Sequence, residues 1–247
     1  MEQPKGFKIK GQEHKVLKLH RAIYGLKQAS LSWWKQLDKS VREFGFKQLY
    51  ANAGIFVCQH KDGTMLVMLA YVDDILFLGP NKILLLNKKA LLMKRWECRD
   101  LGECKEFLRM RITRKAGKIY IDQTVYLQKI LLRFGITNSR FAATPLPQGY
   151  KPLDNNTAPD SVFCSKFQSV IGLLLYLMLG TRPDIAYAVT RLSQFAVNPS
   201  REHLDKALYI CHYLAGTSNY ALVYDGPFNK GLMAYTDSDW AQDPIKC

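Results

Sequence analysis

The stretch Leu69-Ala70-Tyr71-Val72-Asp73-Asp74-Ile75-Leu76-Phe77-Leu78 decides the fold, because it sets two adjacent carboxylates within an otherwise apolar sequence. Apolar runs of this length and composition are typical of buried strands. Two like charges would be costly inside such a pair of strands. The stretch therefore predicts a strand-turn-strand hairpin with Asp73 and Asp74 at its tip.

A divalent cation would remove the repulsion between these carboxylates. Mg²⁺ prefers carboxylate oxygens and commonly shares its coordination shell with substrate phosphates. Carboxylates fixed at the end of two strands suit phosphoryl or nucleotidyl transfer assisted by metal ions. The alternative is an ordinary solvated Asp-Asp turn, which is the commoner meaning of such a pair alone. The apolar flanks favour the metal site, since a solvated turn more often carries Gly or Asn.

The sequence around the hairpin predicts the rest of an α+β unit. Apolar residues recur every three or four positions from Leu31 to Phe44, which indicates a helix with one buried face. The two strands of the hairpin are predicted at 65–72 and 75–78, and one further strand at 55–58, with a turn at 61–63. A second helix is expected over 82–96, with Leu85, Leu86, Leu92 and Met93 available for packing.

The second half of the chain predicts a basic hairpin followed by helices. Strands are expected at 107–113 and 118–122, and helices at 126–134, 165–179 and 201–215. The proline-rich segment 144–160 indicates a linker or surface loop. Two more strand-like runs cover 220–224 and 232–235.

The composition indicates a globular protein with a polyanionic partner. The 247 residues are 48% hydrophobic and carry a net charge of +14, which favours nucleic acid or an anionic surface. The six cysteines include no Cys-x-x-Cys pair, so a zinc site is poorly supported. With no secretion signal and the longest apolar run near 171–179, we expect an intracellular protein without a membrane span.

Several segments together resemble one known family. Tyr71-Val72-Asp73-Asp74 followed by an apolar strand is similar to the signature of reverse transcriptases. Further segments are similar, in order, to the copia-type retrotransposon Pol polyprotein, in its reverse transcriptase and ribonuclease H region: 19–29, 100–103, 144–146, 181–188, 213–217 and 235–241. Each segment alone is weak, whereas the ordered set is specific.

This resemblance implies a fold and a domain order. The expected fold is a partial right-hand polymerase with a palm of antiparallel sheet and helices, a thumb, a connection region and the start of a ribonuclease H-like domain. The implied segments are 1–123 for partial fingers and palm, 124–143 for a thumb-like helix, 144–230 for linker and connection, and 231–247 for the first ribonuclease H strand.

The resemblance also implies roles for individual residues. Asp73 and Asp74 would be the catalytic carboxylates that hold Mg²⁺ for DNA synthesis, and Asp237 the first metal ligand of the ribonuclease H site. The implied contacts to an RNA or DNA primer–template and to deoxynucleotides come from Lys27, Gln28, Tyr71, Arg111, Arg114 and Lys118. Strand packing for Tyr71 and solvated surface charge for the cations are the competing interpretations.

The chain departs from the family pattern at three places. The family has another catalytic carboxylate upstream of residues 2–7, and further ribonuclease H carboxylates beyond Cys247, so both metal sites are expected to be incomplete in this chain. Arg109 stands where the family typically has Gly. A Gly there suggests a tight backbone approach, so the resemblance does not carry the family's local primer contacts over to Arg109. The expected product is a polymerase fragment that needs the missing Pol regions and resides in a cytoplasmic particle or the nucleus. A non-catalytic nucleic-acid-binding remnant and an unstable pseudogene product remain alternatives.

Overall fold

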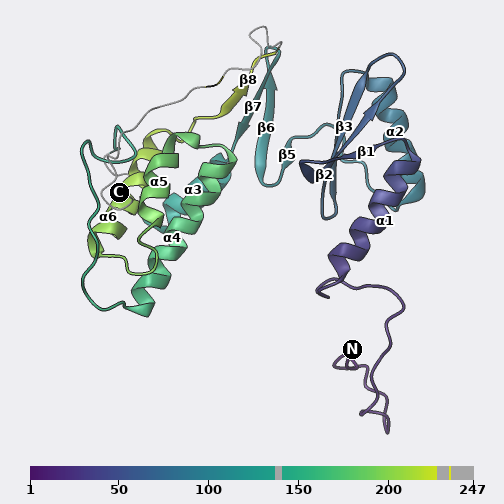
Figure 1. Ribbon diagram of the computed structural model, residues 1–247, viewed down its shortest axis with the longest axis horizontal. Helices are drawn as coiled ribbons and strands as arrows, with labels where there is room; N and C mark the ends of the chain where they lie inside the picture. The colour runs from purple at the N-terminus through teal and green to yellow at the C-terminus, as the bar shows by residue number, and fades with distance from the viewer. Residues whose placement is uncertain (137–140, 227–233, 235–247) are drawn as a thin grey trace. The chain divides into compact units, whose positions relative to one another are not determined.

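The computed structural model describes residues 1–136, 141–226 and 234, and it divides into two compact units, Met1–Glu103 and Cys104–Cys247 (Figure 1). Both are mixtures of helices and antiparallel sheet, as the α+β expectation requires. The finer division into fingers, palm, thumb and connection stays a prediction.

The first unit packs two helices on one face of a four-stranded antiparallel sheet. The sheet has the order β1-β2-β3-β4. Its elements are α1 (Ala29–Glu43), β1 (Lys47–Leu49), β2 (Asn52–Gln59), β3 (Met65–Tyr71), β4 (Asp74–Leu78) and α2 (Lys82–Arg95). The core between helices and sheet consists of Leu37, Val41, Phe46, Phe56, Cys58, Leu66, Met68 and Leu92. The predicted helices and the β2–β3–β4 strands are confirmed, whereas β1 was not predicted.

The buried face of α2 differs from the predicted one. Leu92 is buried and Leu84 and Leu85 pack against the core, but Leu86 and Met93 are exposed. The reason is that residues seven apart share a helix face, so Leu85 and Leu92 form one row and Leu86 and Met93 form the next. The helix buries the first row. Because all four of these residues are apolar, the sequence does not distinguish one row from the other.

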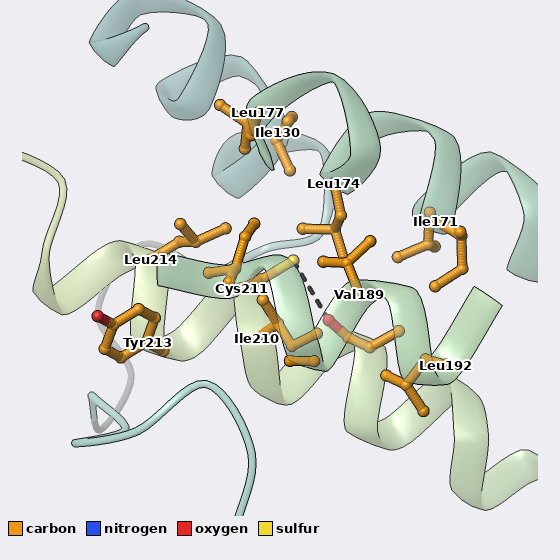
Figure 2. Packing of buried hydrophobic residues seen from close by; sticks show 14 of the residues in the cluster. Ile130, Ile171, Leu174, Leu177, Val189, Leu192, Ile210, Cys211, Tyr213 and Leu214 are labelled. Carbon is orange, nitrogen blue, oxygen red and sulfur yellow. Dashed lines mark hydrogen bonds between the residues drawn. The ribbon is translucent and has the colours of Figure 1, made fainter. Parts of the chain in front are cut away.

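The second unit joins a small antiparallel sheet to a helical core. The sheet has the order β5-β6-β7-β8, with β5 (Glu106–Phe107), β6 (Met110–Lys115), β7 (Lys118–Asp122) and β8 (Leu222–Tyr224). The helices are α3 (Thr124–Arg133), α4 (Ser161–Gly180), the 3-10 turn η1 (Pro183–Ile185), α5 (Ala186–Ser193) and α6 (Arg201–Gly216). The core of α3 to α6 is shown in Figure 2, where Cys211 Sγ donates to the carbonyl of Ala207 within α6.

Two sequence expectations for this unit were wrong. The strand predicted over 107–113 is broken at Leu108 and Arg109, whose φ angles of 50° and 60° reverse the chain between β5 and β6. The helix predicted from residue 165 begins at Ser161, because the Asp160 carboxylate accepts hydrogen bonds from the first-turn amides of Val162 and Phe163. Helix α5 was not predicted, and the strand expected at 232–235 lies outside the described residues.

Helix α4 is the centre of the core in the second unit. By length and composition alone it is the one helix in the described part of the chain that could cross a membrane. Core helices of globular proteins meet the same criterion. Phe167, Leu174 and Leu177 of α4 are almost completely buried between α3, α5 and α6, which supports the core interpretation.

Leu174→Ala is expected to lower the free energy of unfolding by about 2–5 kcal/mol, because it leaves a cavity in this core. Leu174 is 0% exposed, whereas Leu179 of the same helix is 79% exposed. The matched control Leu179→Ala should therefore stay within about 0.5 kcal/mol of the wild type. Urea unfolding followed by circular dichroism measures both, and equal losses in the two variants would contradict this description of the core.

Candidate functional site

The two carboxylates lie at the tip of the β3–β4 hairpin. Tyr71 pairs with Asp74 across the strands, so Val72 and Asp73 form a two-residue loop. Asp73 and Asp74 are exposed, and Tyr71 beside them is 57% exposed. The strands fix the backbone while the carboxylates remain open to a ligand, which is the arrangement that the sequence predicted.

The backbone at this turn is strained. Val72 has a φ of 56°, a left-handed value that costs about 1–2 kcal/mol for a residue with a side chain and is least suited to a β-branched one. The first position of a two-residue turn with positive φ is normally glycine. Strain of this kind concentrates at functional sites, where the surrounding structure maintains it.

Trp33 of α1 maintains the turn. Its indole Nε1–H donates a hydrogen bond of 2.5 Å to the Val72 carbonyl, and its ring packs edge-on against Trp96 at 5.1 Å between centroids. This contact fixes the hairpin tip to α1 and to the segment after α2. Sequence reasoning missed the role of Trp33, because no local pattern links residues 39 positions apart.

Val72→Gly is expected to stabilise the protein by about 1 kcal/mol, since glycine adopts positive φ without steric cost. The loss of side-chain packing is small because Val72 is already half exposed. Val125→Gly in α3 is the control and should destabilise by about 0.5–1 kcal/mol, because its φ is helical. Urea unfolding decides the point, and a Val72→Gly variant as unstable as the control would rule out strain at the turn.

The donor set at the tip is suited to Mg²⁺ but small. Within residues 1–136, 141–226 and 234, no group of three or more His, Cys, Asp or Glu side chains gathers at any point. Asp73 and Asp74 are therefore the carboxylates available here, and Mg²⁺ is commonly held by one or two carboxylates together with substrate phosphates. A site for two metal ions would need a further carboxylate. Asp237, the predicted ribonuclease H ligand, lies outside the described residues.

The remaining predicted site residues fall into two groups. Lys27 and Gln28 are exposed at the start of α1, and the Gln28 side chain makes no capping hydrogen bond. In the second unit the predicted cations contact the protein: Arg111 Nε is 3.0 Å from Asp122, Arg114 donates to the Cys104 carbonyl at 2.8 Å, and Lys118 is 4.0 Å from Asp225. Their nucleic-acid roles stay predictions.

The Arg111–Asp122 pair organises the junction between β7 and α3. Burial raises the pKa of Asp122, but hydrogen bonds from Thr124 and from Arg111 outweigh it and hold that pKa below its ordinary value. The same carboxylate accepts from the Thr124 amide and hydroxyl at 3.0 and 2.6 Å. Arg111 therefore has a structural partner in the fold whatever else it contacts.

Carboxylates that are open to a ligand can hold the metal ions that polymerases use for nucleotidyl transfer. The family model described as reverse transcriptase (RNA-dependent DNA polymerase) matches residues 1–148. This chain belongs to that reverse transcriptase family.

Its relatives are Pol polyproteins of copia-type retrotransposons. It is 35% identical over 98% of its length to the retrovirus-related Pol polyprotein from transposon TNT 1-94 of Nicotiana tabacum, and 35% over 98% to that from transposon RE1 of Arabidopsis thaliana. It spans 19% and 16% of those proteins. It is also 30% identical over 96% of its length to the putative transposon Ty5-1 protein of Saccharomyces cerevisiae, of which it spans 77%. No solved structure matches the chain.

Proposed function

We propose that this chain forms the metal-binding hairpin and the adjoining nucleic-acid-binding part of an RNA-directed DNA polymerase of a copia-type retrotransposon. The observation that carries the proposal is the pair Asp73 and Asp74, exposed at a strained turn that Trp33 fixes. Membership of the reverse transcriptase family supports it. In this proposal residues 1–123 are partial fingers and palm, residues 124–143 contain a thumb-like helix, residues 144–230 are linker and connection, and residues 231–247 open a ribonuclease H-like domain.

The proposed reaction is DNA synthesis on an RNA or DNA template. The primer 3′-hydroxyl attacks the α-phosphate of a deoxynucleotide, so that a new P–O bond forms and pyrophosphate leaves. Mg²⁺, when bound, supplies charge neutralisation at the reacting phosphate. Asp73 would hold the metal most directly, with Asp74 beside it. Tyr71 lies next to them on the exposed tip, where the primer end is expected.

The proposed partners are a primer–template, deoxynucleotides and other regions of a Pol polyprotein. The net charge of +14 suits a polyanion. Lys27 and Gln28 would contact template or nucleotide, and Arg111, Arg114 and Lys118 the primer strand. The rest of the Pol protein would supply the additional catalytic carboxylate, and the expected location is a cytoplasmic particle or the nucleus.

A chimaeric polymerase tests this function. Residues 1–247 would replace the matching segment of the TNT 1-94 Pol polyprotein, to which they are 35% identical over 98% of this chain. We expect primer extension on an RNA template that requires Mg²⁺ and stops when the metal is chelated. The unmodified parent is the positive control, and a parent with a Gly/Ser linker in place of the segment is the negative control.

The isolated chain should extend no primer under the same conditions, because its described residues gather only two carboxylates at the tip. A folded chimaera that binds primer–template and extends nothing would contradict the polymerase proposal. It would instead favour the non-catalytic nucleic-acid-binding alternative.

A further inference from the structure

The turn between β5 and β6 places an arginine in a conformation that suits glycine. Phe107 pairs with Met110, so Leu108 and Arg109 form a two-residue turn with φ angles of 50° and 60°. Turns with two positive φ angles favour Asn-Gly, and each residue with a larger side chain is disfavoured there. Glycine would adopt this conformation without steric cost, and this chain has an arginine there in spite of it.

The turn is fixed against helix α4. The Tyr176 hydroxyl donates a hydrogen bond of 2.8 Å to the Leu108 carbonyl, and the Tyr176 ring packs edge-on against Tyr126 of α3 at 4.8 Å between centroids. Burial raises the pKa of the Tyr126 hydroxyl, whereas the charges of Arg109 and Arg133 oppose this rise. The two guanidinium groups therefore lie close enough to Tyr126 to influence it.

Arg109 differs from the neighbouring arginines in having no partner. Arg111 is paired with Asp122, Arg114 donates to the Cys104 carbonyl, and Arg133 donates to the Ser169 hydroxyl at 3.2 Å. No hydrogen bond or ion pair to Arg109 is made by any residue of the described chain, and its side chain is exposed. Neither an unpaired cation nor a strained backbone stabilises the fold, so stability does not explain an arginine at position 109.

The two helices beside the turn carry no acidic residue. Neither α3 nor α4 contains Asp or Glu. On α3, Tyr126, Lys129 and Arg133 follow one another at helical spacing on one side, and the contacts of Tyr126 with Tyr176 and of Arg133 with Ser169 place that side along α4. The acid-free strip thus consists of Arg109, Tyr176, Tyr126, Lys129, Arg133 and Ser169.

The length of the strip suits a nucleic-acid backbone. Tyr126 and Arg133 lie seven positions apart in α3, which is about 10 Å at a rise of about 1.5 Å per residue. This is roughly the axial rise of three nucleotides in one strand of a duplex. Guanidinium groups bind phosphate oxygens in a bidentate manner and do not need a particular base.

We propose that Arg109 is a phosphate-binding residue for duplex nucleic acid, held in its strained turn because that turn places its guanidinium at the end of the acid-free strip on α3 and α4. The proposal rests on the nucleic-acid-binding role proposed above and names a contact specific to this chain. In this proposal the strain at residue 109 lowers the stability of the fold and is kept because the turn positions the binding site, as is common at functional sites.

Arg109→Gly in the full 247-residue chain is the decisive variant. Because glycine relieves the backbone strain, Tm is expected to rise by about 2–6 °C. Because one phosphate contact is lost, affinity for a labelled 20-base-pair RNA–DNA duplex is expected to fall about eightfold at 0.1 M salt, and the slope of log K against log salt is expected to decrease by about 0.9. Arg109→Lys should keep most of the affinity and the wild-type Tm.

Ala116→Gly is the matched control. Ala116 occupies a positive-φ position of the β6–β7 turn, with φ of 51°, and carries no charge. Its replacement should raise Tm in the same way and leave both affinity and salt dependence unchanged. Fluorescence anisotropy at several salt concentrations measures binding, and differential scanning calorimetry measures Tm.

The outcomes separate this inference from the proposed function. Salt-dependent duplex binding that is unchanged in Arg109→Gly would overturn the assignment of Arg109 and leave the proposed function standing. An Arg109→Gly variant with a lower Tm would overturn the strain argument. No salt-dependent binding by the wild-type chain would count against the nucleic-acid-binding function itself.

Discussion

Asp73→Asn in the chimaeric polymerase is expected to reduce Mg²⁺-dependent primer extension to the level of the linker control. The substitution keeps the size and the turn geometry but removes the charge that is proposed to bind the metal. Because Asp73 lies in the loop and is exposed, no fold contact of its side chain is lost. Asp74→Asn should cause a smaller loss, since Asp74 is the less direct ligand in the proposal.

Asp62→Asn is the control for this experiment. Asp62 is also an exposed aspartate in a hairpin turn of the same sheet, between β2 and β3, where it accepts a hydrogen bond from the Thr64 amide that asparagine can also accept. Its replacement should leave extension unchanged. Duplex binding by Asp73→Asn should be equal to or stronger than that of the wild type, since a negative charge is removed. Full extension by Asp73→Asn would remove Asp73 from the catalytic site.

Arg182→Met is expected to lower the free energy of unfolding by about 1.5–3 kcal/mol, because it removes a buried guanidinium whose hydrogen bonds include a charged partner, Asp184. Arg182 is 3% exposed and donates to Asp184 at 3.0 and 2.7 Å. It also donates to the carbonyl and hydroxyl oxygens of Thr217 at 3.1 and 2.5 Å. These bonds join η1 to the end of α6, so the variant should lose packing between them.

Arg201→Met supplies the comparison, since it removes an exposed pair. Arg201 is 80% exposed and lies 3.8 Å from Asp205, and such pairs contribute about 0–1 kcal/mol. Urea unfolding at pH 7 compares the two variants. A loss in Arg182→Met no larger than in Arg201→Met would show that the buried network does not stabilise the fold.

The pH dependence of the Arg182→Met loss provides an independent check. Burial raises the pKa of Asp184, but hydrogen bonds from Arg182 and Tyr213 outweigh it and hold that pKa below its ordinary value. A lowered folded pKa contributes stability that is present above the unfolded pKa of about 3.9 and is lost as the pH falls through the folded pKa. The difference between wild type and Arg182→Met should therefore shrink in acid.

The parts of the fold that the sequence predicts are those with a local signal. Helix α6 has a regular apolar face from Leu204 to Leu214, and the β2–β3 hairpin has Asp62-Gly63 at its turn. The β5–β6 turn at Leu108 and Arg109 contains neither Gly nor Asn, so its residues predict a continuous strand. Tyr176 holds that turn from a position 68 residues away, which no local pattern reveals.

In the candidate site, too, the sequence predicts the features that have a local signal and misses those that depend on tertiary contacts. The adjacency of Asp73 and Asp74 and their apolar flanks are visible in the sequence, and they predict the hairpin tip. The hydrogen bond from Trp33 to Val72 depends on how α1 packs beside the sheet, so it emerges only from the tertiary structure. A count of basic residues likewise does not show that Arg111 is paired with Asp122.

Strand β4, which begins with Asp74, has a hydrogen-bonded neighbour on one side only, because it ends the order β1-β2-β3-β4 within the described residues. Its remaining residues are Ile75, Leu76, Phe77 and Leu78, so the open edge has no Lys or Pro to discourage pairing. An extended peptide can add to such an edge through its main chain. Association of the isolated chain with itself is therefore expected to involve the five residues of β4, beside the Asp73–Asp74 tip. A synthetic peptide that occupied this edge would act as a solubilising chaperone for the chain.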